Sequence, residues 1–453
     1  MLARFRSHRG LILMGAALLL LLVSGLFLAS ALSRQGEPYL GEVALTGSPY
    51  RIRLLKTYDG PVDYSWQSSR FRSFLPSAPR VPPNIHVQLA GTDRITGQPG
   101  QTFLFRTVDD RGRYVMPMGN SVHGIVCEFV ESTGFVFQVQ IAMADFPHWG
   151  TYAFTRSAFP RRDRELRIRM ERESPGMTPA EMLVVPNPYY RADFPEWQPA
   201  PLPTMKSNGP LKVHLEKVFA DDHHRGARLE LRGESAQADW QQPYFDYHFE
   251  DATGNRGLAL SPFEPVWKAV VRIYRSSTSP FPDELHEVLS GVPILKPGTV
   301  QPIHRTIEMG GVQCLVRCAA GAGIVRLQGE TLTARINEGG DSTPVFTGST
   351  GQGFHELASP SPFLWIEIRQ LSQHSRIVVQ QVLPDGKRSE CPLTSISTSD
   401  GAGSRNYVLA RLENAAIPDV TEITLAVNRP ETMEFQIAPP AEARERILNP
   451  PHH

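Results

Sequence analysis

From about residue 40 onward, the chain consists of short segments in which apolar and polar residues alternate, separated by glycine, proline, asparagine and aspartate. Residues 50–54, 211–215 and 270–274 are clear examples. A period of two places the apolar side chains on one face of an extended strand, which can then pack on a core. Long amphipathic helices are missing, and only residues 283–289 and 441–448 have a short helical pattern. The sequence therefore predicts an all-β fold of antiparallel strands joined by tight turns.

A similar strand occurs three times along the chain. It covers residues 49–58 and 210–219, and a more divergent copy covers residues 311–320. Self-similarity at long spacing is typical of tandem structural units. A chain of 453 residues has room for several domains of roughly 100–200 residues each. We therefore expect three repeated β units.

Each unit also contains a strand that runs into a turn of acidic residues and glycine, at residues 103–112, 247–254 and 377–386. Aspartate caps its own backbone in such turns, and glycine supplies the positive φ angle. The first and third units share three further landmarks, which pair 152–156 with 407–411, 166–170 with 423–427, and 182–188 with 435–440. These matches make the first and third units the better supported pair.

The repeats place three antiparallel β-sandwich domains at residues 41–188, 208–300 and 304–440, followed by a C-terminal tail at 441–453. Their strand number and length are broadly immunoglobulin-like. This is a likeness of architecture, and it implies no activity.

Two stretches between strands have a marked composition. Residues 189–207 form a linker within a proline-dense stretch, and such a density favours extended, semi-rigid structure. Within the linker, Phe194 and Trp197 are expected to dock on a neighbouring domain. Residues 339–353, rich in glycine, serine and threonine, are typical of a long mobile loop.

Residues 11–32 carry no charged side chain and are almost entirely apolar. About 20 such residues span a bilayer as a helix. Arginines precede the span, at positions 4, 6 and 9, which places residues 1–10 in the cytoplasm and the rest of the chain outside it. The alternative is a cleaved signal peptide, because residues 29–31 have the form of a cleavage site. In both cases the β-rich part lies outside the cytoplasm.

The charge balance excludes nucleic acid as a partner. The chain has 46 basic and 46 acidic residues, and no basic stretch interleaves with aromatic residues. It contains no sequon for N-glycosylation, which favours a bacterial protein. We therefore expect a single-pass protein of the bacterial inner membrane that contacts the bilayer through residues 11–32, with its β domains in the periplasm.

The chain has four cysteines. Cys314 and Cys318 are expected to share one face of a strand, roughly 13 Å apart, which exceeds the reach of a disulfide. One of them could pair with Cys391, or all could be buried free thiols. Cys127 has no obvious partner nearby in the sequence.

No motif for catalysis, metal binding or nucleotide binding stands out, so we expect no catalytic residue, no metal and no cofactor. Residues 221–224, Asp-Asp-His-His, are typical of a solvated turn, because consecutive residues do not easily converge on one ion. Residues 348–356 gather a hydroxyl, an imidazole and a carboxylate, yet members of a triad must meet in space. His123 and Cys127 are similarly read as strand neighbours.

Aromatic residues give the best indication of binding. Phe245, Tyr247 and Phe249 share one face of a predicted strand, which favours a place in the core. Trp240 and Tyr244 lie near a turn and are candidates for an exposed platform that binds a sugar or a partner.

The sequence thus favours a membrane-anchored envelope protein with a binding or structural role rather than an enzyme. An envelope protein or a glycan is the expected partner. Two alternatives stay open: a module that binds carbohydrate or cell wall through Trp240 and Tyr244, and a hydrolase with its site at a domain junction.

Overall fold

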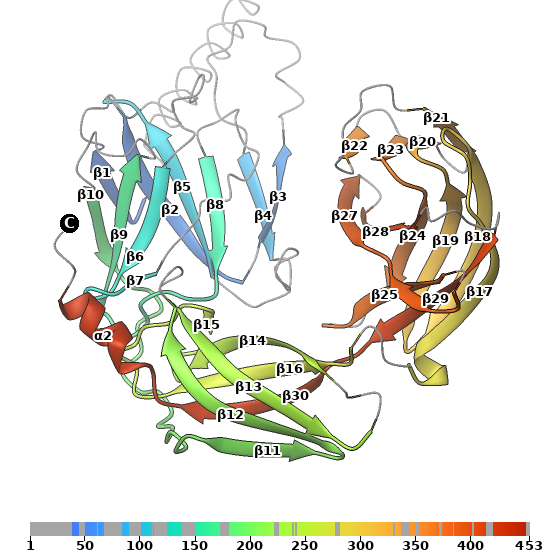
Figure 1. The fold of residues 1–453 in the computed structure, drawn as a ribbon. Helices are drawn as coiled ribbons and strands as arrows, with labels where there is room; N and C mark the ends of the chain where they lie inside the picture. The colour runs from blue at the N-terminus through green and yellow to red at the C-terminus, as the bar shows by residue number, and fades with distance from the viewer. Residues whose placement is uncertain are drawn as a thin grey trace, which may run out of the picture. The chain divides into compact units, whose positions relative to one another are not determined.

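A computed structural model gives the arrangement of the strands (Figure 1). The structure describes residues 39–44, 50–60, 62–67, 84–89, 101–110, 112, 125–137, 151–172, 181–221, 226–237, 240, 242–276, 281–328, 331–336, 345–349, 354–370, 374–383, 385–400, 403–413 and 420–449. The predicted anchor at 11–32 and the cytoplasmic stretch at 1–10 lie outside these residues. Within the described part, no helix is long and apolar enough to cross a membrane.

The prediction of an all-β fold of antiparallel strands is confirmed. Contacts divide the chain into two compact units, each built from separate stretches of sequence. The first unit contains residues 1–196, 251–264 and 444–453, and the second contains 197–250 and 265–443. The predicted domain ranges 41–188, 208–300 and 304–440 stay predictions.

The first unit has two four-stranded sheets, ordered β1-β2-β5-β8 and β10-β9-β6-β7, and a separate pair β3-β4. Their strands are β1 (Gly41–Ala44), β2 (Arg51–Asp59), β3 (Val62–Gln67), β4 (Asn84–Leu89), β5 (Gln101–Val108), β6 (Ile125–Val130), β7 (Val136–Phe137), β8 (Thr151–Arg156), β9 (Glu165–Arg172) and β10 (Glu181–Pro186). The two sheets share one core, in which Ile52, Phe103 and Phe105 of the first sheet pack with Phe129 and Ile168 of the second. The C-terminal helix α2 (Ala441–Leu448) packs on the same core through Ile447.

The second unit contains a middle repeat and a last repeat. In the middle repeat the sheets are β11-β12-β13 and β15-β14-β16-β30. These strands are β11 (Thr204–Asn208), β12 (Leu211–Ala220), β13 (Ala227–Ser235), β14 (Tyr244–Asp251), β15 (Arg256–Gly257), β16 (Trp267–Tyr274) and β30 (Glu431–Ile437). Of these, β15 lies in the stretch 251–264, which counts with the first unit.

The last repeat has three sheets, ordered β17-β29-β25-β26, β18-β19-β24-β28-β27 and β21-β20-β23-β22. They contain β17 (His286–Pro293), β18 (Val300–Met309), β19 (Val312–Ala320), β20 (Gly323–Gln328), β21 (Thr331–Arg335), β22 (Val345–Ser349), β23 (Phe354–Ser359), β24 (Phe363–Gln370), β25 (Arg376–Val382), β26 (Arg388–Glu390), β27 (Leu393–Asp400), β28 (Gly403–Arg411) and β29 (Val420–Asn428). The sheet that contains β19 is buried on both faces, by one core cluster around Val316 and another around Trp365.

The three predicted opening strands are β2, β12 and β19, and each carries a β-bulge at the same position. The register shifts between Leu54 and Lys56 in β2, between Leu215 and Lys217 in β12, and between Val316 and Cys318 in β19. In the predicted alignment of 49–58, 210–219 and 311–320, these shifts coincide. A bulge inserts one residue and turns the side chains that follow it to the other face. The shared bulge therefore supports the repeat independently of residue identity.

The bulge also corrects the prediction for the cysteines. Cys314 lies in the core cluster on one face of the sheet, and Cys318 lies in the cluster on the other face. The strand would have kept them on one face without the inserted residue. Cys314, Cys318 and Cys391 are buried free thiols, and burial raises their pKa to about 11 for Cys314 and about 12 for the other two.

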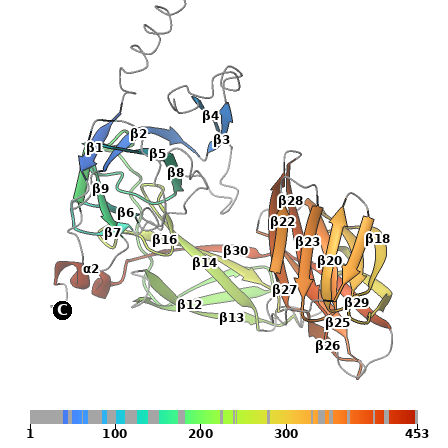
Figure 2. The ribbon, with the colours of Figure 1, turned by 90° about the horizontal axis from the view of Figure 1, so that it is seen from above.

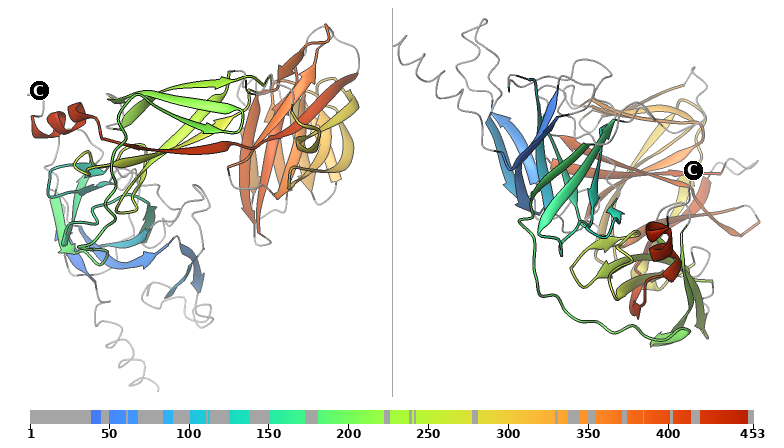
Figure 3. Two further views of the ribbon diagram at one scale, coloured as in Figure 1. Left: turned by 90° about the horizontal axis from the view of Figure 1, so that it is seen from below. Right: turned by 90° about the vertical axis from the view of Figure 1, so that its left-hand side faces the viewer.

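The strand that follows β9, β16 or β29 along the chain lies at the edge of a sheet, and we call it the closing strand. It pairs differently in the first unit and in the second. In the first unit, β10 follows β9 and pairs with it. In the second unit, β17 follows β16 but pairs with β29, whereas β30 follows β29 but pairs with β16. Figure 2 shows β30 beside β16, and the left view of Figure 3 shows the red strand running along the middle repeat. The middle and last repeats thus exchange their closing strands.

An asparagine side chain stabilises the place where the chain passes from β29, in the last repeat, to β30, in the middle repeat. Only Arg429 and Pro430 separate β29 from β30. The buried Asn428 side chain accepts a hydrogen bond from the backbone N–H of Arg275 at 3.2 Å and donates one to its carbonyl at 2.8 Å. Arg275 directly follows β16, so this side chain links the ends of β16 and β29.

Two local predictions are corrected in part. The stretch 339–353 is not a loop throughout, because residues 345–349 form β22 and pair with β23. Of the two short helical patterns, residues 441–448 form α2, but 283–289 form only the 3-10 turn η3 (Asp283–Leu285) followed by the start of β17.

Candidate functional site

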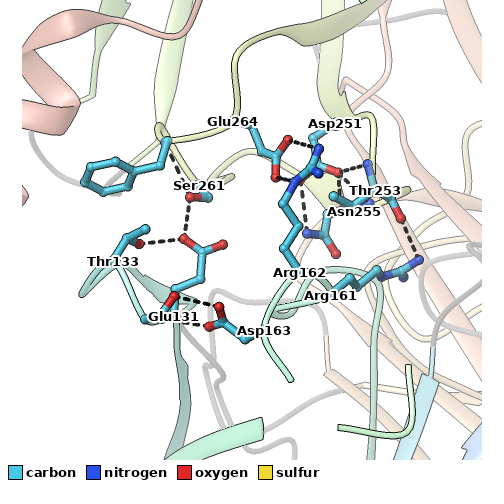
Figure 4. Close-up of polar contacts among 12 residues, drawn as sticks. Glu131, Thr133, Arg161, Arg162, Asp163, Asp251, Thr253, Asn255, Ser261 and Glu264 are labelled. Carbon is cyan, nitrogen blue, oxygen red and sulfur yellow. Dashed lines mark hydrogen bonds and ion pairs between the residues drawn. The ribbon is translucent and has the colours of Figure 1, made fainter. Parts of the chain in front are cut away.

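A group of hydrogen-bonded polar side chains, several of them buried, lies in the first unit, where two turns meet the segment 251–264 (Figure 4). The turn after β6 contributes Glu131 and Thr133, and the loop after β8 contributes Arg161, Arg162 and Asp163. We refer to these residues and their partners in 251–264 as the polar joint.

Asp251 organises the segment 251–264 from within. Its carboxylate accepts hydrogen bonds from the backbone N–H groups of Thr253 at 2.8 Å and Asn255 at 3.1 Å, and from both of their side chains. Asparagine and aspartate commonly fold a turn in this way. The Asn255 side chain in turn accepts the backbone N–H of Phe159 at 3.1 Å, which fixes the turn to the loop after β8. Burial raises the pKa of Asp251, although its hydrogen bonds act in the opposite direction.

Two consecutive arginines connect this loop to the same segment. Arg162 donates two hydrogen bonds to the Glu264 carboxylate, at 2.6 and 3.0 Å, in the bidentate geometry that suits a guanidinium. Arg161 donates to the carbonyl of Thr253 at 3.1 Å and to the side chain of Gln101 at 3.0 Å. Arg444 of α2 donates to the carbonyl of Glu264 at 3.2 Å, so the C-terminal helix is held at the same place.

Glu131 is a second carboxylate of the joint whose pKa is raised. Its carboxylate accepts the hydroxyls of Ser261 at 2.6 Å and Thr133 at 2.7 Å. Burial raises its pKa to about 7, the two hydrogen bonds oppose the rise, and the nearby carboxylates Asp163 and Glu264 add to it. The group therefore changes its charge near neutral pH.

A pocket of about 490 Å³ opens beside the joint, entirely within the first unit. It is lined by Thr57, Asp59, Gln101, Arg161, Pro188, Tyr189, Tyr190, Arg191, Phe194 and Thr253. Five of these belong to the start of the proline-dense stretch. That start is fixed by Asn187, which donates to the carbonyls of Pro160 and Asp163 and accepts the N–H of Tyr189.

The predicted docking of the linker aromatics is seen within each unit. Arg162 lies over the ring of Phe194, 4.8 Å from its centre, in the first unit. In the second unit, the ammonium of Lys268 lies 5.6 Å from the centre of the Trp197 ring.

The structure separates the two predicted binding residues. Trp240 is only 4% exposed and Arg275 covers its ring at 4.4 Å, so the prediction of an exposed platform is wrong for this residue. Tyr244 is 54% exposed, and its ring lies 6.1 Å from that of Tyr274, with the guanidinium of Arg376 over both. Ligand binding by Tyr244 stays a prediction.

The other candidate groups are only partly described. Asp221 is buried and lies 3.5 Å from Arg228, whereas residues 222–224 lie outside the described residues. Glu356 forms ion pairs with Arg326 and Arg335, which accounts for its carboxylate. Among the described residues, no group of three or more metal-ligand side chains is present.

Comparisons with protein-family models, curated proteins and solved structures give no match for this chain.

The polar joint was not predicted from the sequence. The partners Arg162 and Glu264 are 102 positions apart, so no local pattern connects them. A signal did exist in residues 160–164, where three arginines and an aspartate follow proline between two predicted strands. So dense a group of charges in a short connection could have suggested a contact with another segment.

Proposed function

We propose that the chain is a membrane-anchored protein of a bacterial envelope, whose immunoglobulin-like β domains form a binding or structural arm outside the cytoplasm. The exchange of closing strands carries the proposal. Two repeats that share their edge strands cannot separate without breaking both sheets, which suits a part that must keep its shape while it holds a partner.

The polar joint supports the same role. Its charged side chains contact one another and the turns, as in the contacts of Arg162 with Glu264 and of Asp251 with Asn255. Glu264 is buried whereas Arg162 is 43% exposed, and losing the arginine would leave the buried carboxylate without its bidentate partner. These contacts fix the segment 251–264 within the first unit. Buried charge in this region serves to join segments.

The first test is crosslinking in cells with a photo-reactive residue placed on β10 of the full-length protein. Val184 is 48% exposed, whereas its neighbour Val185 is 2% exposed and faces the core. Substitution at position 184 should trap one stoichiometric envelope protein, and substitution at 185 should not. Similar, low-level products at both positions would contradict a protein-binding arm at this face.

A glycan-binding role is favoured by one observation, the exposed Tyr244 beside Tyr274 and Arg376. Aromatic faces stack on sugars, and Tyr244→Ala should then remove binding to cell-wall polysaccharide. Trp240→Ala is a poor probe, because the side chain is buried. Loss of cell-wall binding in Tyr244→Ala, with the thermal unfolding of the protein unchanged, would favour this role over a protein partner.

A further inference from the structure

The pocket of the first unit has an excess of positive charge. Of its ten lining residues, Arg161 and Arg191 are basic and only Asp59 is acidic. The carboxylate of Asp251 acts on Arg161 electrostatically, but it accepts four hydrogen bonds from Thr253 and Asn255 and does not line the pocket. The lining itself thus carries one more positive than negative side chain, which favours an anionic ligand.

Arg161 is held in place before any ligand arrives. Its guanidinium donates to Thr253, Gln101 and the carbonyl of Ser157, and it lies 4.6 Å from the centre of the Phe159 ring. Its buried Nε donor has no hydrogen-bond partner. A guanidinium that is held in one position by its other contacts is well suited to a carboxylate.

The size and the remaining lining restrict the ligand further. A volume of about 490 Å³ lies within the roughly 300–1,000 Å³ usual for small-molecule sites. Tyr189, Tyr190 and Phe194 supply aromatic surface, while Thr57 and Gln101 supply hydroxyl and amide groups. This combination fits a small polar molecule with one acidic group better than an apolar one.

We propose that this pocket binds a small carboxylate ligand, with Arg161 and Arg191 contacting the carboxylate and Asp59 accepting a hydrogen bond from a neighbouring hydroxyl or amide of the ligand. The proposal is independent of the binding arm, since it concerns a separate site. A sugar acid and the free carboxyl end of a peptide both offer this chemistry.

The experiment is calorimetric titration of the full-length purified protein with glucuronate, and separately with an N-acetylated dipeptide that has a free carboxyl end. Glucose and the dipeptide amide are the uncharged controls. We expect one of the two acids to bind at least about tenfold more tightly than its uncharged control, since a charge-assisted pair is lost. The acid that binds identifies the source of the carboxylate.

Variants show whether binding occurs in this pocket. Arg191 is exposed, so Arg191→Gln should fold normally and weaken binding about tenfold. Arg161→Gln should weaken it further, and its folding is checked by thermal unfolding. The matched control is Arg167→Gln, on β9 and outside the lining, which should bind as the unchanged protein does. No binding of either acid up to about 10 mM, or equal binding by the Arg191→Gln and Arg167→Gln variants, would overturn the proposal.

Discussion

The first unit differs from the two repeats of the second unit in how the edge of a sheet is covered. Each needs a strand to cover the edge of the sheet that contains β9, β16 or β29. The first unit uses the next strand of its own chain, β10, whereas the middle and last repeats take one from each other. The difference shows that strand order along the chain leaves open which sheet a closing strand joins, because a hairpin and an exchange bury similar apolar residues.

The two units also differ in the contacts that join their separate segments. In the first unit, charged side chains of the polar joint hold separate segments together, with Arg162 and Glu264 as the bidentate pair. In the second unit, the exchanged strands pair through their backbones, and Asn428 links β29 to the residue after β16. The ion pair between Arg376 of β25 and Asp246 of β14 is an additional link between the two repeats. Stability in the first unit should therefore respond to pH, and stability in the second to core and backbone changes.

The largest effect is expected at the exchanged strand β30. Phe435 is 1% exposed on β30, and Phe435→Ala should destabilise the second unit by about 3–5 kcal/mol through a cavity. Because the strands are exchanged, hydrogen exchange should rise in the middle repeat and in the last repeat together. The matched change is Leu183→Ala on β10, which should raise hydrogen exchange in the first unit alone. If β19 and β24 stay as well protected from hydrogen exchange in Phe435→Ala as in the unchanged protein, the exchanged strands do not couple the two repeats.

The next effect concerns Glu131. Its pKa of about 7 in the folded protein lies above the usual 4.5, so its favourable contribution is complete below pH 4.5 and is lost as the pH rises to about 7. The first unit should be less stable at pH 8 than at pH 4.5 by up to about 3 kcal/mol. Burial raises the pKa of Asp251 too, which adds in the same direction. Hydrogen exchange of β6 and β9 against pH measures the loss.

A Glu131→Gln variant provides the control for this pH dependence. The neutral amide still accepts hydrogen bonds from Ser261 and Thr133, so the dependence should become flatter while the fold is retained. The same pH slope in the variant and the unchanged protein would exclude Glu131 as its source.

A smaller effect is expected from the crossing of β29 into β30. Asn428→Ala removes both hydrogen bonds to Arg275 and leaves two backbone groups without this partner, at a cost of about 1–3 kcal/mol. The denaturation midpoint of the second unit should fall, and that of the first unit should not. Equal shifts in both units would mean that the effect is not local to the crossing.

The smallest effect is expected on the outer surface of the other exchanged strand. Glu287 of β17 pairs with Arg305 of β18, and both side chains are more than 40% exposed. Exposed ion pairs contribute about 0–1 kcal/mol, so Glu287→Gln should leave the midpoint almost unchanged, even in low salt. A loss comparable with that of Phe435→Ala would indicate that charge, rather than burial, holds the exchanged strands.

The sequence predicted the strands better than their partners. Alternation correctly indicated β2, β12 and β16 as strands, because it reflects the local burial of side chains on one face. In contrast, β19 is buried on both faces and was predicted from its similarity to β2 and β12. The matched landmarks 152–156 and 407–411 are β8 and β28, and each lies beside the strand that pairs with an opening strand. The exchange of β17 and β30 involves pairing over long distances, for which periodicity carries no information.

One landmark was matched to the wrong turn. The turns 251–255 and 383–387 have the same two backbone hydrogen bonds, with glycine as the fourth residue, and the equivalent turn in the first unit is 131–135 rather than 109–112. The sequence does not show this match, because residue 131 is a glutamate where residue 251 is an aspartate, and a serine and a threonine follow it. The sheet order shows the same equivalence, because β6, β14 and β25 occupy the same place in their sheets.

The exchange of closing strands has a consequence for the order in which the chain becomes complete during synthesis. The last repeat finds its closing strand β17 already made when β29 emerges, whereas β16 must wait for β30. At about 5–20 residues per second, the roughly 160 residues between the ends of β16 and β30 require on the order of 10–30 s. During that time β16 presents an unpaired edge, and such edges attract other strands. The middle repeat is therefore the part of a newly made chain that most needs protection, because β30, which completes its sheet, is the last of the described strands to be synthesised.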